Sequence, residues 1–94
     1  MASVKGETAS GFAYSVDPDC LDDFYFLETF AKAQKGDLSA LSEMLTMMLG
    51  EKQKTALLKH CEDSKGRAKL SRVGDEIADI YKFLKDTSKK VKNS

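Results

Sequence analysis

The segment from Ser71 to Leu84 carries the strongest helical periodicity in the chain, and this constrains the fold more than any other feature. Its apolar residues recur at i, i+4, i+7, i+8 and i+11 and so share one face of an α-helix; they are Val73, Ile77, Ile80, Tyr81 and Leu84. A helix of this kind packs its apolar face against other elements. We therefore expect an amphipathic helix that Ser71 caps and that belongs to a helical bundle.

A first helix is expected over residues 18–35. Asp17 can accept backbone N–H bonds as its N-cap, Pro18 suits its first position, and Gly36 can end it in the left-handed conformation. The apolar residues that share one stripe of this helix are Cys20, Phe24, Leu27 and Ala31. Further aromatic residues widen the apolar surface, which indicates that the helix has more than one contact.

Two more helices are expected over residues 38–49 and about 51–62, with Gly50 between them as a terminator and Asp37 as the first cap. The methionines of this region divide on a helical wheel: Met44 and Met48 fall on the leucine face, and Met47 falls about 130° from its centre. We expect the first two to fill the core and the third to lie outside it. The loop that follows contains Gly66, which is free to take positive φ.

The fold expected from these segments is all-α, a compact bundle of about four short helices. Residues 1–11 are small and polar and are expected to form a flexible arm, and residues 87–94 lose the helical pattern and are expected to form a frayed, lysine-rich tail. The alternating segment "FAYSV" at 12–16 is the one place where a short extended segment is expected. A single helical domain over 12–86 remains, because 94 residues have room for one core.

The charge balance disfavours a nucleic-acid-binding role. Fifteen basic and fifteen acidic residues give a net charge of zero, whereas nucleic-acid-binding domains concentrate positive charge. Acidic residues dominate between 17 and 31 and lysines between 82 and 92, so self-association of opposed ends is conceivable. No apolar run approaches the roughly 18 residues needed to span a bilayer, and no leader is recognisable. We expect a soluble, intracellular protein without membrane contact.

The chain offers no set of residues for catalysis, a cofactor or a metal. Its single histidine, His60, adjoins Cys61 on one helix, where neighbours point about 100° apart and cannot face each other as a catalytic pair. Cys20 and Cys61 lack the clustered spacing of a zinc site or a redox pair, so we expect both to be reduced, half-buried packing residues. The glycines form no phosphate-binding loop. We therefore expect no enzymatic activity, no cofactor and no small-molecule substrate.

A series of short motifs follows in order from Gly11 to Leu84. An acidic start leads into an aromatic and leucine-rich helix, a glycine-aspartate turn, a helix ending in "LLG" before a glutamate and a glutamine, a "DxxGR" loop and a final helix. The residues that carry these motifs are Leu21, Asp22 and Asp23; Gly36 and Asp37; Leu49, Gly50, Glu51 and Gln53; Asp63, Gly66 and Arg67; and Glu76, Ile77 and Ile80. In this order the chain resembles the tail assembly chaperones of bacteriophages with long non-contractile tails.

The resemblance implies a non-enzymatic function in the cytoplasm of a bacterial host. Chaperones of this family bind the tape measure protein, help the tail tube protein to polymerise around it, and are absent from the mature tail. A helical chaperone can cover apolar helical stripes of such a partner with a groove of its own. The residues alone leave an alternative open: a small helical regulator or adaptor that binds nucleic acid or a host protein through its lysine-rich end.

Four residues are candidates for contact with a partner, because the helical wheels leave them outside the densest apolar stripes; they are Tyr25, Phe26, Phe30 and Met47. Aromatic rings supply large contact areas, and methionine adapts to varied surfaces. For each of them the alternative is ordinary packing against a neighbouring helix, and the sequence leaves both open.

Overall fold

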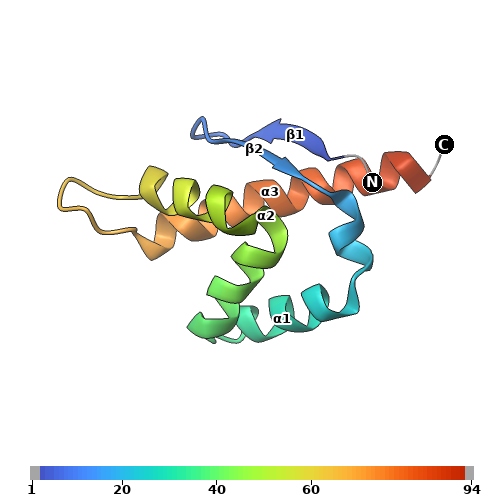
Figure 1. Cartoon of the computed structure of the whole chain (residues 1–94), viewed down its shortest axis with the longest axis horizontal. Helices are drawn as coiled ribbons and strands as arrows, with labels where there is room; N and C mark the ends of the chain where they lie inside the picture. The colour runs from blue at the N-terminus through green and yellow to red at the C-terminus, as the bar shows by residue number, and fades with distance from the viewer. Residues whose placement is uncertain (1–2, 93–94) are drawn as a thin grey trace.

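The computed structural model describes the backbone of residues 3–92 and the side chains of residues 3–87. This part of the chain forms a mainly helical domain with a short hairpin at its start, shown in Figure 1. Its elements are β1 (Val4–Glu7), β2 (Ala13–Val16), the 3₁₀ helix η1 (Pro18–Asp22), α1 (Phe24–Gln34), α2 (Leu38–His60) and α3 (Leu70–Lys92). The expectation of an all-α fold is therefore wrong in detail. Residues 1, 2, 93 and 94, the outer ends of the expected arm and tail, lie outside the described residues.

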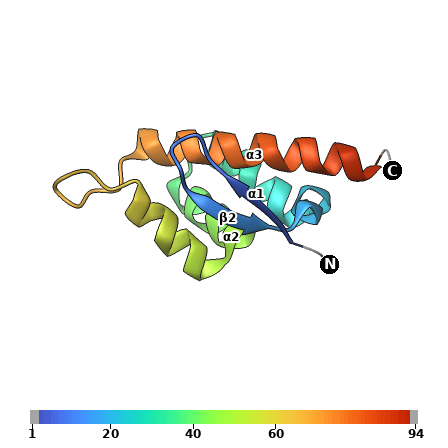
Figure 2. The same cartoon turned by 90° about the horizontal axis from the view of Figure 1, so that it is seen from above.

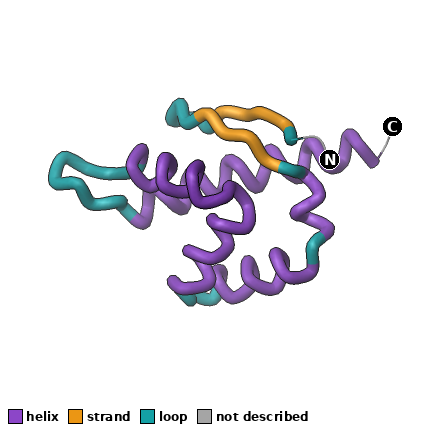
Figure 3. The backbone as a smooth tube through the Cα atoms, viewed as in Figure 1, coloured by secondary structure: helices purple, strands orange, loops and turns teal. Residues whose placement is uncertain are grey.

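The N-terminal hairpin occupies much of the segment that we assigned to a flexible arm. The two strands are antiparallel, and the residues opposite each other are Val4 and Val16, Lys5 and Ser15, Gly6 and Tyr14, and Glu7 and Ala13. The N–H of Gly11 closes the turn by donating to the carbonyl of Thr8, and the φ of 95° at this position favours glycine. The extended segment expected at 12–16 is confirmed as β2. Figure 3 shows the hairpin on one side of the helices.

The helix expected over 18–35 is divided at Asp23. Asp17 caps η1 as expected, since its carboxylate accepts a backbone N–H bond of 2.9 Å from Asp19. Asp23 has extended dihedral angles, φ −99° and ψ 112°, and its carboxylate accepts the N–H of Tyr25 at 3.0 Å to cap α1. A second capping aspartate, Asp23, thus ends the 3₁₀ helix η1 and begins the α-helix α1.

The helices expected over 38–49 and about 51–62 are both present, joined into α2 by a kink at Gly50. This residue has φ 80° and ψ 162°, which are not helical. Asp37 caps the start of α2 as expected, and the side-chain Nε2 of Gln53 donates across the kink to the carbonyl of Leu49 at 2.8 Å. Gln53 therefore supplies a partner where the break disturbs the helical hydrogen bonding.

The loop between α2 and α3 is closed by Asp63. Its carboxylate accepts the backbone N–H groups of Lys65 at 2.8 Å and of Arg67 at 3.0 Å, and it also accepts the Arg67 Nε–H at 3.2 Å. These hydrogen bonds, from the backbone of Arg67 first, lower the pKa of Asp63. Gly66 takes the expected positive φ, 78°.

The amphipathic helix expected from Ser71 is confirmed as α3, but Ser71 is not its cap. The helix begins at Leu70, and the N–H of Val73 already bonds to the carbonyl of Lys69 at 3.0 Å. It continues to Lys92, through most of the segment 87–94 that we assigned to the tail. Its predicted apolar face is buried at Val73, Ile77, Ile80 and Leu84, with Tyr81 half-buried.

The core lies where α1, α2, α3 and the inner face of the hairpin meet; Figure 2 shows the hairpin lying across the helices. The largest fully buried side chains are Phe26, Met44, Leu57, Ile80, Leu84, Val16 and Cys61. Met44 and Met48 are 1% and 6% exposed, whereas Met47 is 36% exposed. The predicted division of the methionines is therefore confirmed.

Candidate partner-binding surface

The apolar stripe that we expected on the first helix points to solvent where it lies in α1. Phe24 is 72% exposed and Leu27 is 39% exposed, whereas Phe26 is 1% exposed. The prediction counted helical turns from Cys20 onward, but Cys20 lies in η1 and the break at Asp23 interrupts the count. The stripe that contains Phe24 and Leu27 therefore lies on the exposed face of α1.

The four predicted contact residues fall into two groups. Tyr25, 73% exposed, and Met47 lie at the surface. Phe26 is buried, and Phe30 is half-buried, with its ring stacked on that of Phe26 at 6.2 Å and tilted against that of Tyr81 at 4.9 Å between centroids. The structure thus places Phe26 and Phe30 in the packing role that the sequence left as the alternative.

An apolar groove runs between the two segments of α2 and the start of α3. Its lining is mostly leucine and consists of Leu38, Leu41, Ser42, Leu45, Lys54, Leu58, Ala68, Leu70 and Val73. Leu38 and Leu70 are 63% and 60% exposed. These two large apolar side chains form an exposed rim beside the groove. Neither leucine stands out in the sequence, because each lies at the first position of its helix.

A lysine with no acidic partner lies at this groove. The Nζ of Lys54 donates to Ser42 Oγ at 2.7 Å and to Thr46 Oγ1 at 3.1 Å, which ties the two segments of α2 together across the kink. Among the side chains that the structure describes, no carboxylate forms an ion pair with Lys54. The groove therefore combines leucines with an ammonium group that is free to pair with a partner's carboxylate.

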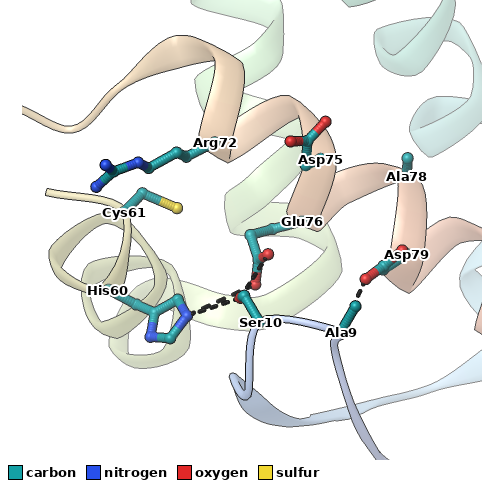
Figure 4. Close-up of a pocket in the computed structure, with 9 residues that line it drawn as sticks. All are labelled: Ala9, Ser10, His60, Cys61, Arg72, Asp75, Glu76, Ala78 and Asp79. Atoms are coloured by element: carbon teal, nitrogen blue, oxygen red, sulfur yellow. Dashed lines mark hydrogen bonds and ion pairs between the residues drawn. The ribbon is translucent and has the colours of Figure 1, made fainter.

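A second hollow, about 610 Å³ in volume and lined mostly by polar and charged residues, lies where the tip of the hairpin meets α2 and α3 (Figure 4). Glu76, 4% exposed, accepts the hydroxyl protons of Thr8 at 2.7 Å and of Ser10 at 2.8 Å. The Oγ of Ser10 also lies 2.9 Å from His60 Nε2, and the N–H of Ala9 donates to an Asp79 carboxylate oxygen at 2.8 Å. The hairpin tip is thus fastened to both helices.

The contact of Ser10, His60 and Glu76 does not have the order of a catalytic triad. In a triad the carboxylate binds the distal nitrogen of the imidazole and the imidazole takes the hydroxyl proton. Here Glu76 and His60 both bind the Ser10 hydroxyl, whose single proton goes to the carboxylate, so His60 donates through Nε2–H. The arrangement positions the hairpin and does not activate Ser10. In the part of the chain that the structure describes, no three His, Cys, Asp or Glu side chains are placed to hold a metal ion.

The two cysteines are free thiols in different environments. Burial, and then the carboxylates of Asp17 and Asp23, raise the pKa of Cys20 to about 11. Burial, and then Glu76, raise the pKa of Cys61, which is 1% exposed. Both side chains are packing residues, as expected, although Cys61 is fully buried where we expected half-burial.

None of the helices within the described residues has the length and apolar character needed to cross a membrane. No protein-family model, curated protein or solved structure matches this chain.

Proposed function

We propose that this chain is a tail assembly chaperone of a bacteriophage with a long non-contractile tail. In this role it acts without a cofactor in the cytoplasm of a bacterial host, binds the tape measure protein, assists polymerisation of the tail tube protein, and leaves before the tail is complete. The order of sequence motifs from Gly11 to Leu84 suggests the family. The structural observation that supports it best is the leucine groove with its exposed rim.

The groove suits one apolar stripe of a helix. A tape measure protein exposes such stripes until the tube encloses it, and an amphipathic helix binds by laying its apolar face into a groove. Leu38 and Leu70 would cover the stripe, and Lys54 would pair with an acidic residue at its margin. A small and shallow contact of this kind gives modest affinity, which a chaperone that must leave requires.

The exposed face of α1 is a second area of contact in this proposal. Phe24 and Tyr25 are surrounded in sequence by the exposed acidic residues Asp19, Asp22, Asp23 and Glu28. An aromatic pair among carboxylates favours a partner helix with basic residues beside its apolar stripe. The two areas would therefore select tape measure segments of different charge.

Titration of tape measure helices into the purified chain tests the groove. Overlapping helical peptides are added to wild type, to Leu70→Asp and to Ser71→Asp, and binding is followed by fluorescence anisotropy. We expect at least one peptide to bind wild type and Ser71→Asp equally. The same peptide should bind Leu70→Asp about tenfold or more weakly, because the bound peptide would remove water from the new charge in the groove. Binding of none of the peptides, combined with retention of the chain on DNA at physiological salt, would favour the regulator instead.

A further inference from the structure

The two outer edges of the hairpin differ in how their backbone groups are satisfied. At β2, the N–H of Ser15 donates to Gln53 Oε1 at 2.7 Å and its carbonyl accepts from Gln53 Nε2 at 2.8 Å. Ser15 therefore points its backbone groups away from β1. Lys5 lies opposite Ser15, so it belongs to the same non-hydrogen-bonded pair and points its own N–H and C=O outward on the other side.

The outer edge of β1 is open. The alternation of an antiparallel ladder gives Glu7, opposite Ala13, the same outward direction as Lys5. Among the described residues, none forms a hydrogen bond with the outward backbone groups of Lys5 or Glu7. Both side chains are exposed. An edge of this kind is a template for a further strand.

The charges on this edge are self-complementary. Lys5 and Glu7 are placed symmetrically about Gly6 and lie on the same, outer face of the hairpin. If a second β1 approaches antiparallel with Gly6 opposite Gly6, each Lys5 meets a Glu7. The register is also correct for hydrogen bonding, because both residues of each such pair point their backbone groups toward the other strand.

Gly6 suits the centre of such a pairing. In the pairing with a second copy, Gly6 lies opposite Gly6 in a non-hydrogen-bonded pair, where opposed Cα atoms come within about 4.5 Å. Its inner side is already covered, since a Cβ at this position would lie 2.6 Å from the Tyr14 hydroxyl oxygen. Two glycines therefore bring the strands together without opposing side chains.

We infer that β1 pairs with β1 of a second copy of this chain, so that two hairpins form one four-stranded sheet across a two-fold axis. Each Lys5–Glu7 pair exchanges two backbone hydrogen bonds and one exposed ion pair. Exposed lysines ordinarily protect edges by repelling a like strand, and Glu7 converts that repulsion into attraction. An unrelated extended peptide would gain the hydrogen bonds without both ion pairs, so the second copy is the favoured partner.

The dimer is weak, because it rests on a few exposed hydrogen bonds and ion pairs. The dimer does not depend on the proposed chaperone function, since it requires only the purified chain.

Sedimentation equilibrium from micromolar concentrations to roughly 1 mM tests for the dimer, because the midpoint of a weak dimer lies in this range. We expect wild type to show a concentration-dependent shift from monomer to dimer that weakens with added salt.

Charge reversal identifies the edge. Lys5→Glu gives an all-acidic edge and Glu7→Lys an all-basic edge, so each variant alone is expected to dimerise about tenfold or more weakly than wild type. An equimolar mixture of the two restores association, because opposite edges then meet. Lys5→Pro removes the outward N–H but no bond to β2, and it is also expected to weaken the dimer. Lys52→Glu is the control: it makes the same charge change as Lys5→Glu at an exposed residue of α2, and it leaves the dimer unchanged.

Two results would overturn the inference. One is a wild-type chain that stays monomeric up to roughly 1 mM. The other is a dimer that Lys5→Glu and Glu7→Lys leave as strong as wild type, or a mixture of these variants that associates no better than either alone. Circular dichroism of each variant establishes that the fold is retained.

Discussion

The side-chain amide of Gln53 lies against the backbone of Ser15 as a neighbouring strand would: its Oε1 accepts the N–H of Ser15 at 2.7 Å, and its Nε2 donates to the carbonyl of Ser15 at 2.8 Å. The same amide nitrogen also donates to the carbonyl of Leu49 beside the kink at Gly50. One residue thus holds the outer edge of the hairpin to the point where α2 bends. The bend and the hairpin position depend on each other.

Replacement of Gln53 by alanine is expected to destabilise the domain. The change removes three hydrogen bonds, two to Ser15 and one to Leu49. We expect a loss of about 1–3 kcal/mol in the free energy of unfolding, measured by urea denaturation. The matched control Lys52→Ala, one residue earlier and exposed, should change it by less than about 0.5 kcal/mol. Equal effects of the two substitutions would argue against the role of Gln53.

The same substitution at two glycines is expected to have opposite effects. At Gly50 and at Gly74, no described atom outside the chain neighbours and the adjacent helix backbone lies within 4 Å of the place that a Cβ would take, so an added methyl group meets no clash at either site. Gly50→Ala forces φ 80°, ψ 162° on a residue with a side chain and should cost about 1–3 kcal/mol. Gly74→Ala lies within α3 and should stabilise by about 0.5–1 kcal/mol. A destabilised Gly74→Ala, or a neutral Gly50→Ala, in urea denaturation would contradict this account.

The helices could be predicted from the sequence because their signals are local. Asp17 and Asp37 cap as expected, and Gly36, Gly50 and Gly66 all have positive φ. The hairpin was missed at β1 because the position of this strand depends on contacts with distant parts of the chain. Residues 1–11 have little apolar surface of their own, and Thr8 and Ala9 in this segment are held by Glu76 and Asp79, which lie far along the chain.

Replacement of Glu76 by glutamine is expected to loosen the hairpin tip. The carboxylate accepts two hydroxyl protons, whereas the amide offers one acceptor oxygen, so one hydroxyl loses its partner. We expect a loss of about 1–2 kcal/mol in stability and faster hydrogen exchange of the hairpin amides. Asp75→Asn, an exposed neighbour, is the control. Unchanged exchange rates in Glu76→Gln would show that the carboxylate does not hold the tip.

The two thiols are expected to resist alkylation. Because the pKa of Cys20 is raised to about 11, its thiolate fraction at pH 8 is about one in a thousand, and its rate should rise about tenfold per pH unit up to about pH 10. The raised pKa also means that its contribution to stability is complete below pH 9.0 and is lost as the pH rises toward 11. Peptide mapping by mass spectrometry separates it from buried Cys61, which should react more slowly. A rate for Cys20 that levels off near pH 9 would contradict the assignment.

The candidate surface was predicted less well than the fold. Tyr25 and Met47 are exposed as the wheels suggested, but Phe24 and Leu27 exchanged places with Phe26, because the helix restarts at Asp23. The groove was not predicted, since it combines residues from three separate segments. Two of the motifs that carry the family resemblance, Gly50 with Gln53 and Asp63 with Arg67, form the kink and the loop and do not line the groove. They therefore indicate the fold more directly than the partner.

Co-expression with the tape measure protein tests the central claim most directly. The measured quantity is the fraction of tape measure protein that remains in the soluble extract of bacterial cells. Four conditions are compared: no chaperone, wild type, the double variant Leu38→Asp, Leu70→Asp, and the control Ser71→Asp, with circular dichroism establishing that each variant is folded. We predict several-fold more soluble tape measure protein with wild type and with the control than without them, and little gain with the double variant. A tape measure protein that stays insoluble beside wild type would contradict the proposed function, and one that the double variant keeps equally soluble would contradict the groove.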